Sequence, residues 1–296
     1  MISKYYPSKV LLFGEYLVLS GANALAIPFD KFKGNFTFDN VETDPIIDEF
    51  YNFLKSQDWY SLNTEFNISK FNYDIKSGLN FVSNIPIGYG IGSSGAVSAA
   101  IYERYFTPQK SEDLFQLKKI LAQIENFFHS SSSGIDPLVS FLNNPVKINS
   151  DSTIEKTKFS FSNYSDFDFY LVDSGTSRTT AEYVKIFKEK MSNSTFQNEF
   201  INKAISINNT LINDFLGINE KQVFEKFKEI SHLQFHYLSE MIIDPITALW
   251  KNSLNNKDIS IKLCGAGGGG FYLAICKKEI ELQELYHTIR FIKLKN

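Results

Sequence analysis

The stretch that decides the fold is PIGYGIGSSGA, residues 86–96. Its four glycines are Gly88, Gly90, Gly92 and Gly95. Glycine has no Cβ, so backbone N–H groups can approach an anion closely, and a helix that follows adds the positive end of its dipole. The small and apolar run AVSAAIYERYF comes directly afterwards. We therefore predict a helix that begins near Ser93, with a phosphate-binding glycine loop at its N-terminus.

Two alternatives to a phosphate loop remain open for this stretch. The glycines could form a plain tight turn, and Ser93 and Ser94 could cap the helix instead of offering a hydroxyl to phosphate-bound Mg²⁺. The glycines also match G-x-G-x-x-G, the pattern of NAD-dependent oxidoreductases. Pro86 interrupts the preceding strand, and no lysine of the Walker type follows the glycines. The favoured interpretation is a phosphate-binding loop that is neither of the dinucleotide type nor of the Walker type.

Length, composition and charge limit the class of protein. The 296 residues predict two domains, 1–150 and 151–296, joined by a polar segment after Pro145. Lys and Arg number 30 against 33 Asp and Glu, a balance that disfavours nucleic acid as a partner. The two cysteines, Cys264 and Cys276, make neither a disulfide framework nor a zinc pattern. With no leader peptide or long apolar run, we expect a cytoplasmic protein without a membrane partner.

Hydrophobic periodicity gives a mixed α and β pattern. Strands are expected between residues 9 and 84, including KVLLFGEYLVL, GNFTFDN and FNYDIKS (71–77), with a short helix near DPIIDEFYNFLKS. A helical stripe runs through residues 114–128, and further helices are expected over 180–191, 197–216, 219–241 and 245–255. The segment SIKLCGAGGGGFYLAIC, residues 260–276, is typical of a strand, a glycine turn and a second strand.

Two further segments carry charges that need an explanation. Lys9 and Glu15 lie in the apolar run PSKVLLFGEYLVLSG, and burial of either charge without a partner is costly, so each should be paired unless it points to solvent. In IENFFHSSSSGIDP, residues 124–137, Glu125 flanks the apolar stripe of a predicted helix and Asp136 lies in the loop that follows the helix. A returning loop can bring these carboxylates to one cleft, as a metal ligand and a base for phosphoryl transfer. Asp136 could also simply begin an Asp-Pro turn, and His129 could end the helix.

Taken in order, PSKVLLFGEYLVLSG, PIGYGIGSSGA and KLCGAGGGGFYLAI resemble the three signature motifs of the GHMP small-molecule kinase superfamily. The segment FFHSSSSGIDPLVS narrows the resemblance to the mevalonate kinases. The resemblance implies an α+β fold of two domains, an N-terminal domain like domain 2 of ribosomal protein S5 and a ferredoxin-like C-terminal domain, with the active site between them. It further implies ATP-dependent phosphorylation of the primary hydroxyl of mevalonate, with Mg²⁺ as the cofactor.

The same resemblance implies roles for individual residues. Asp136 is the expected base and Lys9 its partner, while Ser94 and Glu125 are the expected ligands of Mg²⁺. The substrate-side residues are expected to be Glu15, Tyr16, His129 and Thr180. The ATP phosphates are expected at Gly88, Gly90, Gly92, Ser93, Ser94 and Gly95. The predicted partners are therefore ATP and a small hydroxy acid, and the predicted assembly is a monomer or a homodimer.

The chain also departs from the motifs of mevalonate kinases. Tyr16 stands in place of a histidine, Ser8 in place of a glycine, and Ser130 and Ser132 in place of a glycine and a proline. The GEYLVL segment resembles phosphomevalonate kinases, whose phosphorylated substrate Arg178 or Lys4 could bind. Phosphomevalonate kinase, another GHMP kinase, and a GHMP-like protein that binds nucleotide without catalysis therefore remain alternatives.

Overall fold

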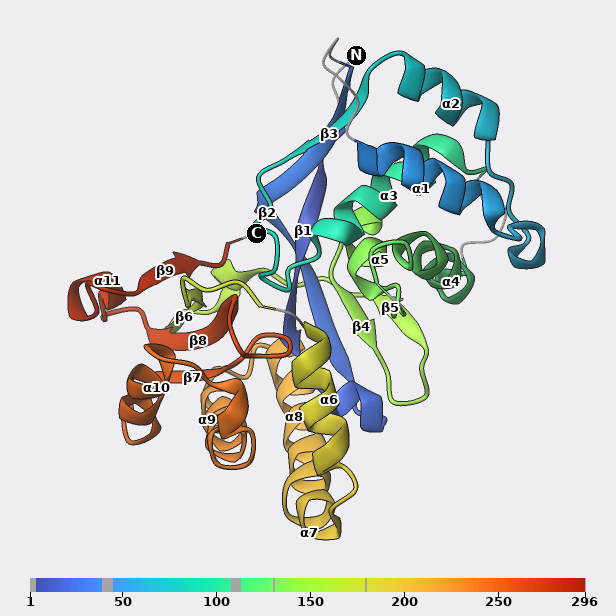
Figure 1. The fold of residues 1–296 in the computed structure, drawn as a ribbon. Helices are drawn as coiled ribbons and strands as arrows, with labels where there is room; N and C mark the ends of the chain where they lie inside the picture. The colour runs from blue at the N-terminus through green and yellow to red at the C-terminus, as the bar shows by residue number, and fades with distance from the viewer. Residues whose placement is uncertain (1–3, 39–44, 108–112, 130, 179, 296) are drawn as a thin grey trace. The chain divides into compact units, whose positions relative to one another are not determined.

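The computed structural model describes residues 4–38, 45–107, 113–129, 131–178 and 180–295 (Figure 1). The chain divides into two compact units. The first unit comprises residues 1–9, 27–86 and 91–144, and the second comprises 10–26, 87–90 and 145–296. The main change of unit at Asn144–Pro145 is close to the expected boundary at residue 150. The short segments 10–26 and 87–90 group with the second unit, however, so neither unit is one continuous stretch of sequence.

The first sheet has the strand order β1-β2-β4-β5, with β3 also paired to β2. Its strands are β1 (Tyr6–Phe13), β2 (Ala24–Phe38), β3 (Leu79–Ser83), β4 (Val146–Ile148) and β5 (Ile154–Lys156). In the first unit β3 runs antiparallel to β2, with Gly34 opposite Ser83 and Phe38 opposite Leu79. In the second unit β4 pairs with Ala24 to Ala26 of β2. Residues from both β1 and β2 therefore belong to each unit.

The described residues of the first unit also form five helices and the 3-10 turn η2 (Tyr60–Leu62). They are α1 (Pro45–Ser56), α2 (Ile68–Lys76), α3 (Ser93–Tyr105), α4 (Leu114–Glu125) and α5 (Ile135–Leu142). The predicted start of a helix at Ser93 is confirmed by α3. Small buried residues on α3, among them Ala96, Ala99 and Ala100, let α5 pack closely against it. This packing brings the beginning of α5 to the glycine loop.

The strand predicted over FNYDIKS is wrong, because residues 68–76 form helix α2. The side chain of Asn67 accepts a hydrogen bond from the backbone N–H of Lys70 and so caps the helix. The buried residues Phe71, Asp74 and Ile75 are spaced by three and four positions, which is the period of a helix. The aromatic residues of this short segment favour a strand, but the cap and the spacing of the buried residues favour the helix that forms.

The second unit contains an antiparallel four-stranded sheet in the order β7-β8-β6-β9. Its strands are β6 (Phe167–Asp173), β7 (Ile259–Leu263), β8 (Phe271–Lys277) and β9 (Arg290–Lys293). Its helices are α6 (Thr180–Lys190), α7 (Ser194–Phe196), α8 (Asn202–Leu216), α9 (Glu220–Tyr237), α10 (Ile246–Leu254) and α11 (Leu282–Leu285). Short turns of 3-10 or π-helix are η1 (Leu17–Ser20), η3 (Phe161–Asn163), η4 (Gln197–Ile201) and η5 (Ser239–Met241).

The core of the second unit lies between this sheet and its helices. Helices α9 and α10 pack against β7 (Figure 1), and every residue of β7 is buried. The predicted strand, glycine turn and strand over residues 260–276 are confirmed by β7 and β8, and the helices expected after residue 180 are present with small shifts at their ends. Helices and antiparallel sheets together confirm the predicted α+β class. Within the described residues, no helix is both long enough and apolar enough to span a membrane.

Candidate active site

Lys9 and Asp136 form an ion pair in the first unit. Lys9 lies on β1 and Asp136 in the first turn of α5, and Lys9 Nζ is 2.7 Å from Asp136 Oδ1. The lysine side chain is 9% exposed and the aspartate side chain 28%. The ammonium is thus mostly withdrawn from water, while the carboxylate can still be reached by a ligand. The expectation that Lys9 has a charged partner is confirmed.

Two glycines of the loop let the backbone come close to Asp136. Gly92 precedes α3 with φ 78°, and a Cβ at this position would lie 3.3 Å from Asp136 Oδ2. A Cβ on Gly95 would lie 2.8 Å from the backbone carbonyl carbon of Asp136. Both positions need glycine because of this close approach, and Gly92 also because of its left-handed backbone. The glycine loop and the carboxylate therefore adjoin one another.

Ser94, Glu125 and His129 form a second group beside this pair. Ser94 Oγ donates to Glu125 Oε1 at 2.9 Å, and lies 3.0 Å from His129 Nε2. Glu125 is the last residue of α4, and it is 4% exposed. No side chain caps α3, whose N-cap residue is Gly92, so Ser94 does not have the capping role that the sequence left open. Ser93 starts α3 and is half-buried.

The carboxyl group of Glu125 has an unusual affinity for protons. Burial, and after it the negative charge of Asp136, raise its pKa from 4.5 to about 7. The hydroxyls of Ser132 and Ser94 and the charge of Lys9 act in the opposite direction. A buried carboxylate of this kind is costly to ionise without a cation nearby, which is the environment expected of a metal ligand.

Glu125 and Ser94 fit Mg²⁺ better than they fit a structural metal. Mg²⁺ prefers oxygen ligands and keeps several waters, so one or two protein groups and the phosphates of a nucleotide complete its shell. Throughout the described parts of the chain, no group of three His, Cys, Asp or Glu side chains could hold a metal ion. The neighbouring oxygens of Ser94 and Glu125 therefore suit a cation that arrives with a nucleotide.

The second unit contains Gly88, Gly90 and a basic residue, Arg178, near them. The backbone N–H of Arg178 donates to the carbonyl of Gly88 at 3.0 Å, and a Cβ on Gly90 would lie 2.5 Å from Arg178 Nη2. The guanidinium donates from Nη1 to Thr180 Oγ1 and from Nε to the carbonyl of Gly269. Burial lowers the pKa of Arg178, and no ion pair with a carboxylate is found for it among the described residues. Its Nη2 group, enclosed by glycines, has donors to offer an anion.

Glu15 contacts β7, and Tyr16 contacts the glycine turn between β7 and β8. Lys262, which is 1% exposed, donates from Nζ to Glu15 Oε1 and to the carbonyl of Leu263. Tyr16 donates from its hydroxyl to the carbonyl of Ala266 at 2.6 Å, and its ring stacks on Phe187. The expectation that Glu15 has a charged partner is confirmed. Contact of Glu15 and Tyr16 with a substrate stays a prediction.

The structure thus divides the predicted site residues between the two units. The first unit brings together Lys9, Gly92, Ser94, Gly95, Glu125, His129 and Asp136, with Ser93 at the start of α3. The second unit contains Gly88, Gly90 and Thr180 around Arg178. In the same unit Glu15 pairs with Lys262 on β7, and Tyr16 contacts the glycine turn. Ser130 lies outside the described residues.

Sequence reasoning missed Lys262 and left the role of Arg178 open. For Lys262 a signal was present, because a lysine inside the apolar strand sequence of β7 needs a partner as much as Lys9 does.

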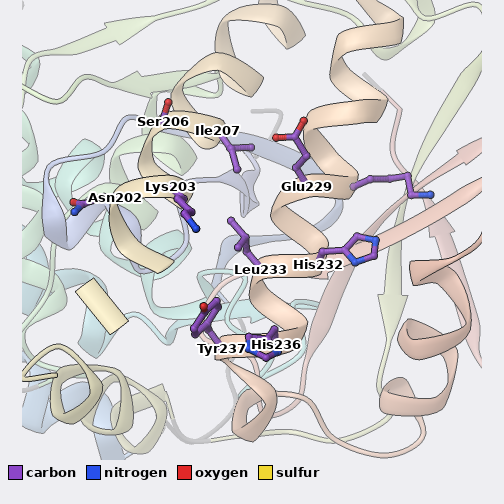
Figure 2. Close-up of a pocket in the computed structure, with 10 residues that line it drawn as sticks. Asn202, Lys203, Ser206, Ile207, Glu229, His232, Leu233, His236 and Tyr237 are labelled. Carbon is purple, nitrogen blue, oxygen red and sulfur yellow. The ribbon is translucent and has the colours of Figure 1, made fainter. Parts of the chain in front are cut away.

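A separate hollow of about 1030 Å³ is lined by residues of α8 and α9, which are drawn in Figure 2. Its lining comes from Asn202, Lys203, Ser206 and Ile207 on α8 and from Lys228, Glu229, His232, Leu233, His236 and Tyr237 on α9. Among these described residues, none was predicted as a site residue. His232 and Lys228 already contact backbone carbonyls, those of Leu254 and Asn256.

Comparison with known proteins finds chains of similar sequence and similar fold. Residues 58–144 match the family model of the GHMP kinases N terminal domain. The mevalonate kinase of Pyrococcus horikoshii is 23% identical, over 91% of this chain and 87% of its own length. The crystal structure of Methanococcus jannaschii mevalonate kinase superposes with a TM-score of 0.67 at 19% identity, covering 99% of this chain and 98% of that one. Streptococcus pneumoniae phosphomevalonate kinase in complex with phosphomevalonate and AMPPNP gives 0.67 at 14% identity, with both chains fully covered.

Proposed function

We propose that this chain, which belongs to the GHMP kinase superfamily, phosphorylates the primary hydroxyl of mevalonate with ATP to give 5-phosphomevalonate and ADP. The chain is a phosphotransferase that acts on a hydroxyl group. The observation that carries the proposal is the ion pair between Lys9 and Asp136, placed next to the Ser94 and Glu125 oxygens in the first unit. This arrangement offers a base for the hydroxyl and a binding group for a nucleotide's cation in one place.

Asp136 is the base in the proposed reaction. The substrate oxygen attacks the γ-phosphorus of ATP as its proton passes to the Asp136 carboxylate, and the bond from phosphorus to the β-γ bridging oxygen breaks to release ADP. Lys9 holds Asp136 in position and stabilises negative charge that develops on the attacking oxygen. Because little covalent chemistry is required of the protein, positioning and electrostatic stabilisation account for most of the rate.

The glycine loop is the proposed binding site for the ATP phosphates. Gly88, Gly90 and Gly92 have φ values of 78°, 70° and 78°, a backbone conformation that exposes N–H groups without side chains in the way. Ser94 and Glu125 would hold Mg²⁺, which when bound neutralises charge on the phosphates as the transfer proceeds. The N-terminus of α3 adds its dipole to the same anion.

Arg178 is the proposed binding group for the anionic part of the organic substrate. It is held in place by Thr180 and Gly269, and its Nη2 group is directed past Gly90 and Gly265, where any side chain would be in contact with it. A guanidinium fixed in this way suits a carboxylate, which accepts two parallel hydrogen bonds. Mevalonate carries such a carboxylate as well as a primary hydroxyl.

Phosphomevalonate is the second candidate substrate. The GEYLVL segment resembles that of phosphomevalonate kinases, and Tyr16 replaces the histidine of mevalonate kinases. In the structure the Tyr16 hydroxyl donates to the carbonyl of Ala266, so this side chain is hydrogen-bonded to the glycine turn. A phosphate would suit the Arg178 guanidinium as well as a carboxylate does.

Coupled measurement of ADP release distinguishes the candidates. Mevalonate, phosphomevalonate, homoserine and sugars are supplied one at a time with ATP and Mg²⁺, and ADP formation is followed for each. We expect turnover with mevalonate. Turnover with phosphomevalonate and none with mevalonate would overturn the substrate assignment and leave the kinase chemistry in place. ATP binding without turnover of any alcohol would argue for a protein that only binds nucleotide.

A further inference from the structure

Ser132 links the end of α4 to the beginning of α5. Its backbone N–H donates to Asn126 Oδ1 at 2.8 Å, and its hydroxyl donates to Glu125 Oε2. The same hydroxyl oxygen accepts a hydrogen bond from the backbone N–H of Gly134 at 2.9 Å. One small side chain therefore contacts both the proposed metal ligand and the loop that leads to the proposed base.

The two oxygens of Glu125 are bonded to two different hydroxyls. Oε1 accepts from Ser94 Oγ at 2.9 Å, and Oε2 accepts from Ser132 Oγ. Donors on both oxygens fix the rotation of the carboxylate about its last bond, which a single donor would leave adjustable. Glu125 is 4% exposed, so water is a poor substitute for either hydroxyl.

The loop after Ser132 leaves little room for adjustment. Gly134 has φ 73°, and a Cβ on it would lie 2.3 Å from the backbone carbonyl oxygen of Lys118 on α4. Helix α5 begins at the next residue, Ile135, and its first turn carries Asp136. A displacement of Ser132 would therefore affect the approach of α5 to α4 as well as Glu125.

We propose that Ser132 is a positioning residue, whose hydroxyl orients the Glu125 carboxylate so that Oε1 is presented together with Ser94 to the divalent cation of a nucleotide. The inference rests on the proposed function, because that function assigns the cation to Glu125. Ser132 itself contacts neither the nucleotide nor the substrate in this account. The cation it serves is a hard divalent ion, Mg²⁺ or its substitute Mn²⁺.

Binding of Mn²⁺ tests this role without relying on turnover. Electron paramagnetic resonance reports the unbound Mn²⁺ in a titration of protein with a non-hydrolysable ATP analogue. In the Ser132→Ala variant we expect the affinity for Mn²⁺ in this ternary complex to fall about 10- to 150-fold, the equivalent of one lost hydrogen bond to a charged group. Ser132→Thr retains the hydroxyl and should bind within about 2-fold of the unmodified protein. The matched control Ser131→Ala removes an exposed hydroxyl from the same loop and should change nothing.

Several outcomes would overturn the inference. A Ser132→Ala protein that melts at a lower temperature but binds Mn²⁺ with unchanged affinity would show that Ser132 supports only the fold. A Ser132→Thr protein as weak as the alanine variant would show that the hydroxyl is not what matters. If the alanine variant does not fold, Ser132→Cys keeps the volume with a weak donor, and undiminished Mn²⁺ binding in it would contradict the proposal.

Failure of the proposed function gives a different pattern. If the unmodified protein turns over another alcohol and not mevalonate, the substrate is wrong, while weaker Mn²⁺ binding by Ser132→Ala still supports the role of Ser132. If Glu125→Gln binds Mn²⁺ with the nucleotide analogue as tightly as the unmodified protein, Glu125 is not a metal ligand and the inference about Ser132 falls with it.

Discussion

Lys9 Nζ lies 2.7 Å from Asp136 Oδ1, although the lysine comes from the first strand of the chain and the aspartate from the last helix of the first unit. Asp136 lies close to Gly92 and Gly95, which have no side chains and so leave room for its carboxylate and its backbone. The carboxylate is more exposed than its cationic partner, which suits the proposed role of a base that receives a proton from a substrate.

Replacement of Gly92 by alanine should lower activity more than stability. The new Cβ would lie 3.3 Å from Asp136 Oδ2 and 3.2 Å from its Cβ, so the carboxylate has to move away from Lys9. The left-handed backbone adds a cost of about 1–2 kcal/mol.

Gly21→Ala is the matched control, because Gly21 has φ 81° and no atom within 4 Å of the added Cβ. Both variants should lose similar free energy of unfolding in urea, and only Gly92→Ala should lose turnover by 10-fold or more. Equal turnover by Gly92→Ala and Gly21→Ala would show that Gly92 has no special role in the site.

The pKa of Glu125 predicts how stability depends on pH. Its pKa is about 7 in the folded protein and 4.5 ordinarily, so between these values the folded state binds more protons than the unfolded state. The group's contribution to stability is therefore largest below about pH 4.5 and is lost as pH rises towards 7, a change on the order of 3 kcal/mol.

Glu125→Gln should remove this dependence. The stability of Glu125→Gln relative to the unmodified protein should increase between pH 5 and pH 8, in buffers without divalent cations. Binding of Mn²⁺ with nucleotide by the unmodified protein should change in the opposite direction, strengthening as pH rises through 7. A difference in stability that is constant with pH would mean that Glu125 ionises normally.

The buried pair of Lys262 and Glu15 should be important for stability. Removal of the amine in Lys262→Ala leaves a carboxylate that is 3% exposed, a change that costs about 3–5 kcal/mol. The double variant Lys262→Met with Glu15→Met, which removes both charges, should recover much of that loss. Lys226→Ala is the control, because it breaks a 2.7 Å ion pair with Glu229 on the surface of α9 and should cost at most about 1 kcal/mol. Equal losses for Lys262→Ala and Lys226→Ala in chemical unfolding would contradict this account.

Arg178→Gln should weaken binding of the organic substrate. It removes charge-assisted hydrogen bonds that are each equivalent to a factor of about 10 to 150 in affinity, so the KM for that substrate should rise by this factor while the KM for ATP changes little. Lys185→Gln removes a positive charge from an exposed side chain of α6 and serves as the control for general electrostatic effects. Unchanged KM values in Arg178→Gln would show that the guanidinium only supports the loop around Gly88 and Gly269.

Short-range patterns predicted the parts of the fold and site that depend on neighbouring residues. The glycines at 88–95 and the apolar run after them gave the start of α3, and the spacing between Glu125 and Asp136 suggested that the two carboxylates share a cleft. In FNYDIKS, by contrast, the cap at Asn67 and the helical spacing of buried residues were overlooked in favour of strand-like composition.

Apart from the Lys9–Asp136 pair, which the resemblance to GHMP kinases implied, long-range pairings could not be predicted, because no local pattern specifies them. Glu15 and Lys262 are 247 positions apart, and only the argument that each buried charge needs a partner could have connected them. The double role of the Ser132 hydroxyl depends on the path of a loop, which its sequence of serines does not reveal.

The most direct test of the central claim is the rate of ADP formation with mevalonate, Mg²⁺ and ATP for Asp136→Asn, together with the affinity of the same preparation for an ATP analogue. Asparagine keeps the size of the side chain but cannot accept the proton of the hydroxyl. The account predicts turnover lowered by about 10²- to 10⁴-fold, with affinity for the analogue within a few-fold of the unmodified protein. Undiminished ADP formation by Asp136→Asn would contradict it.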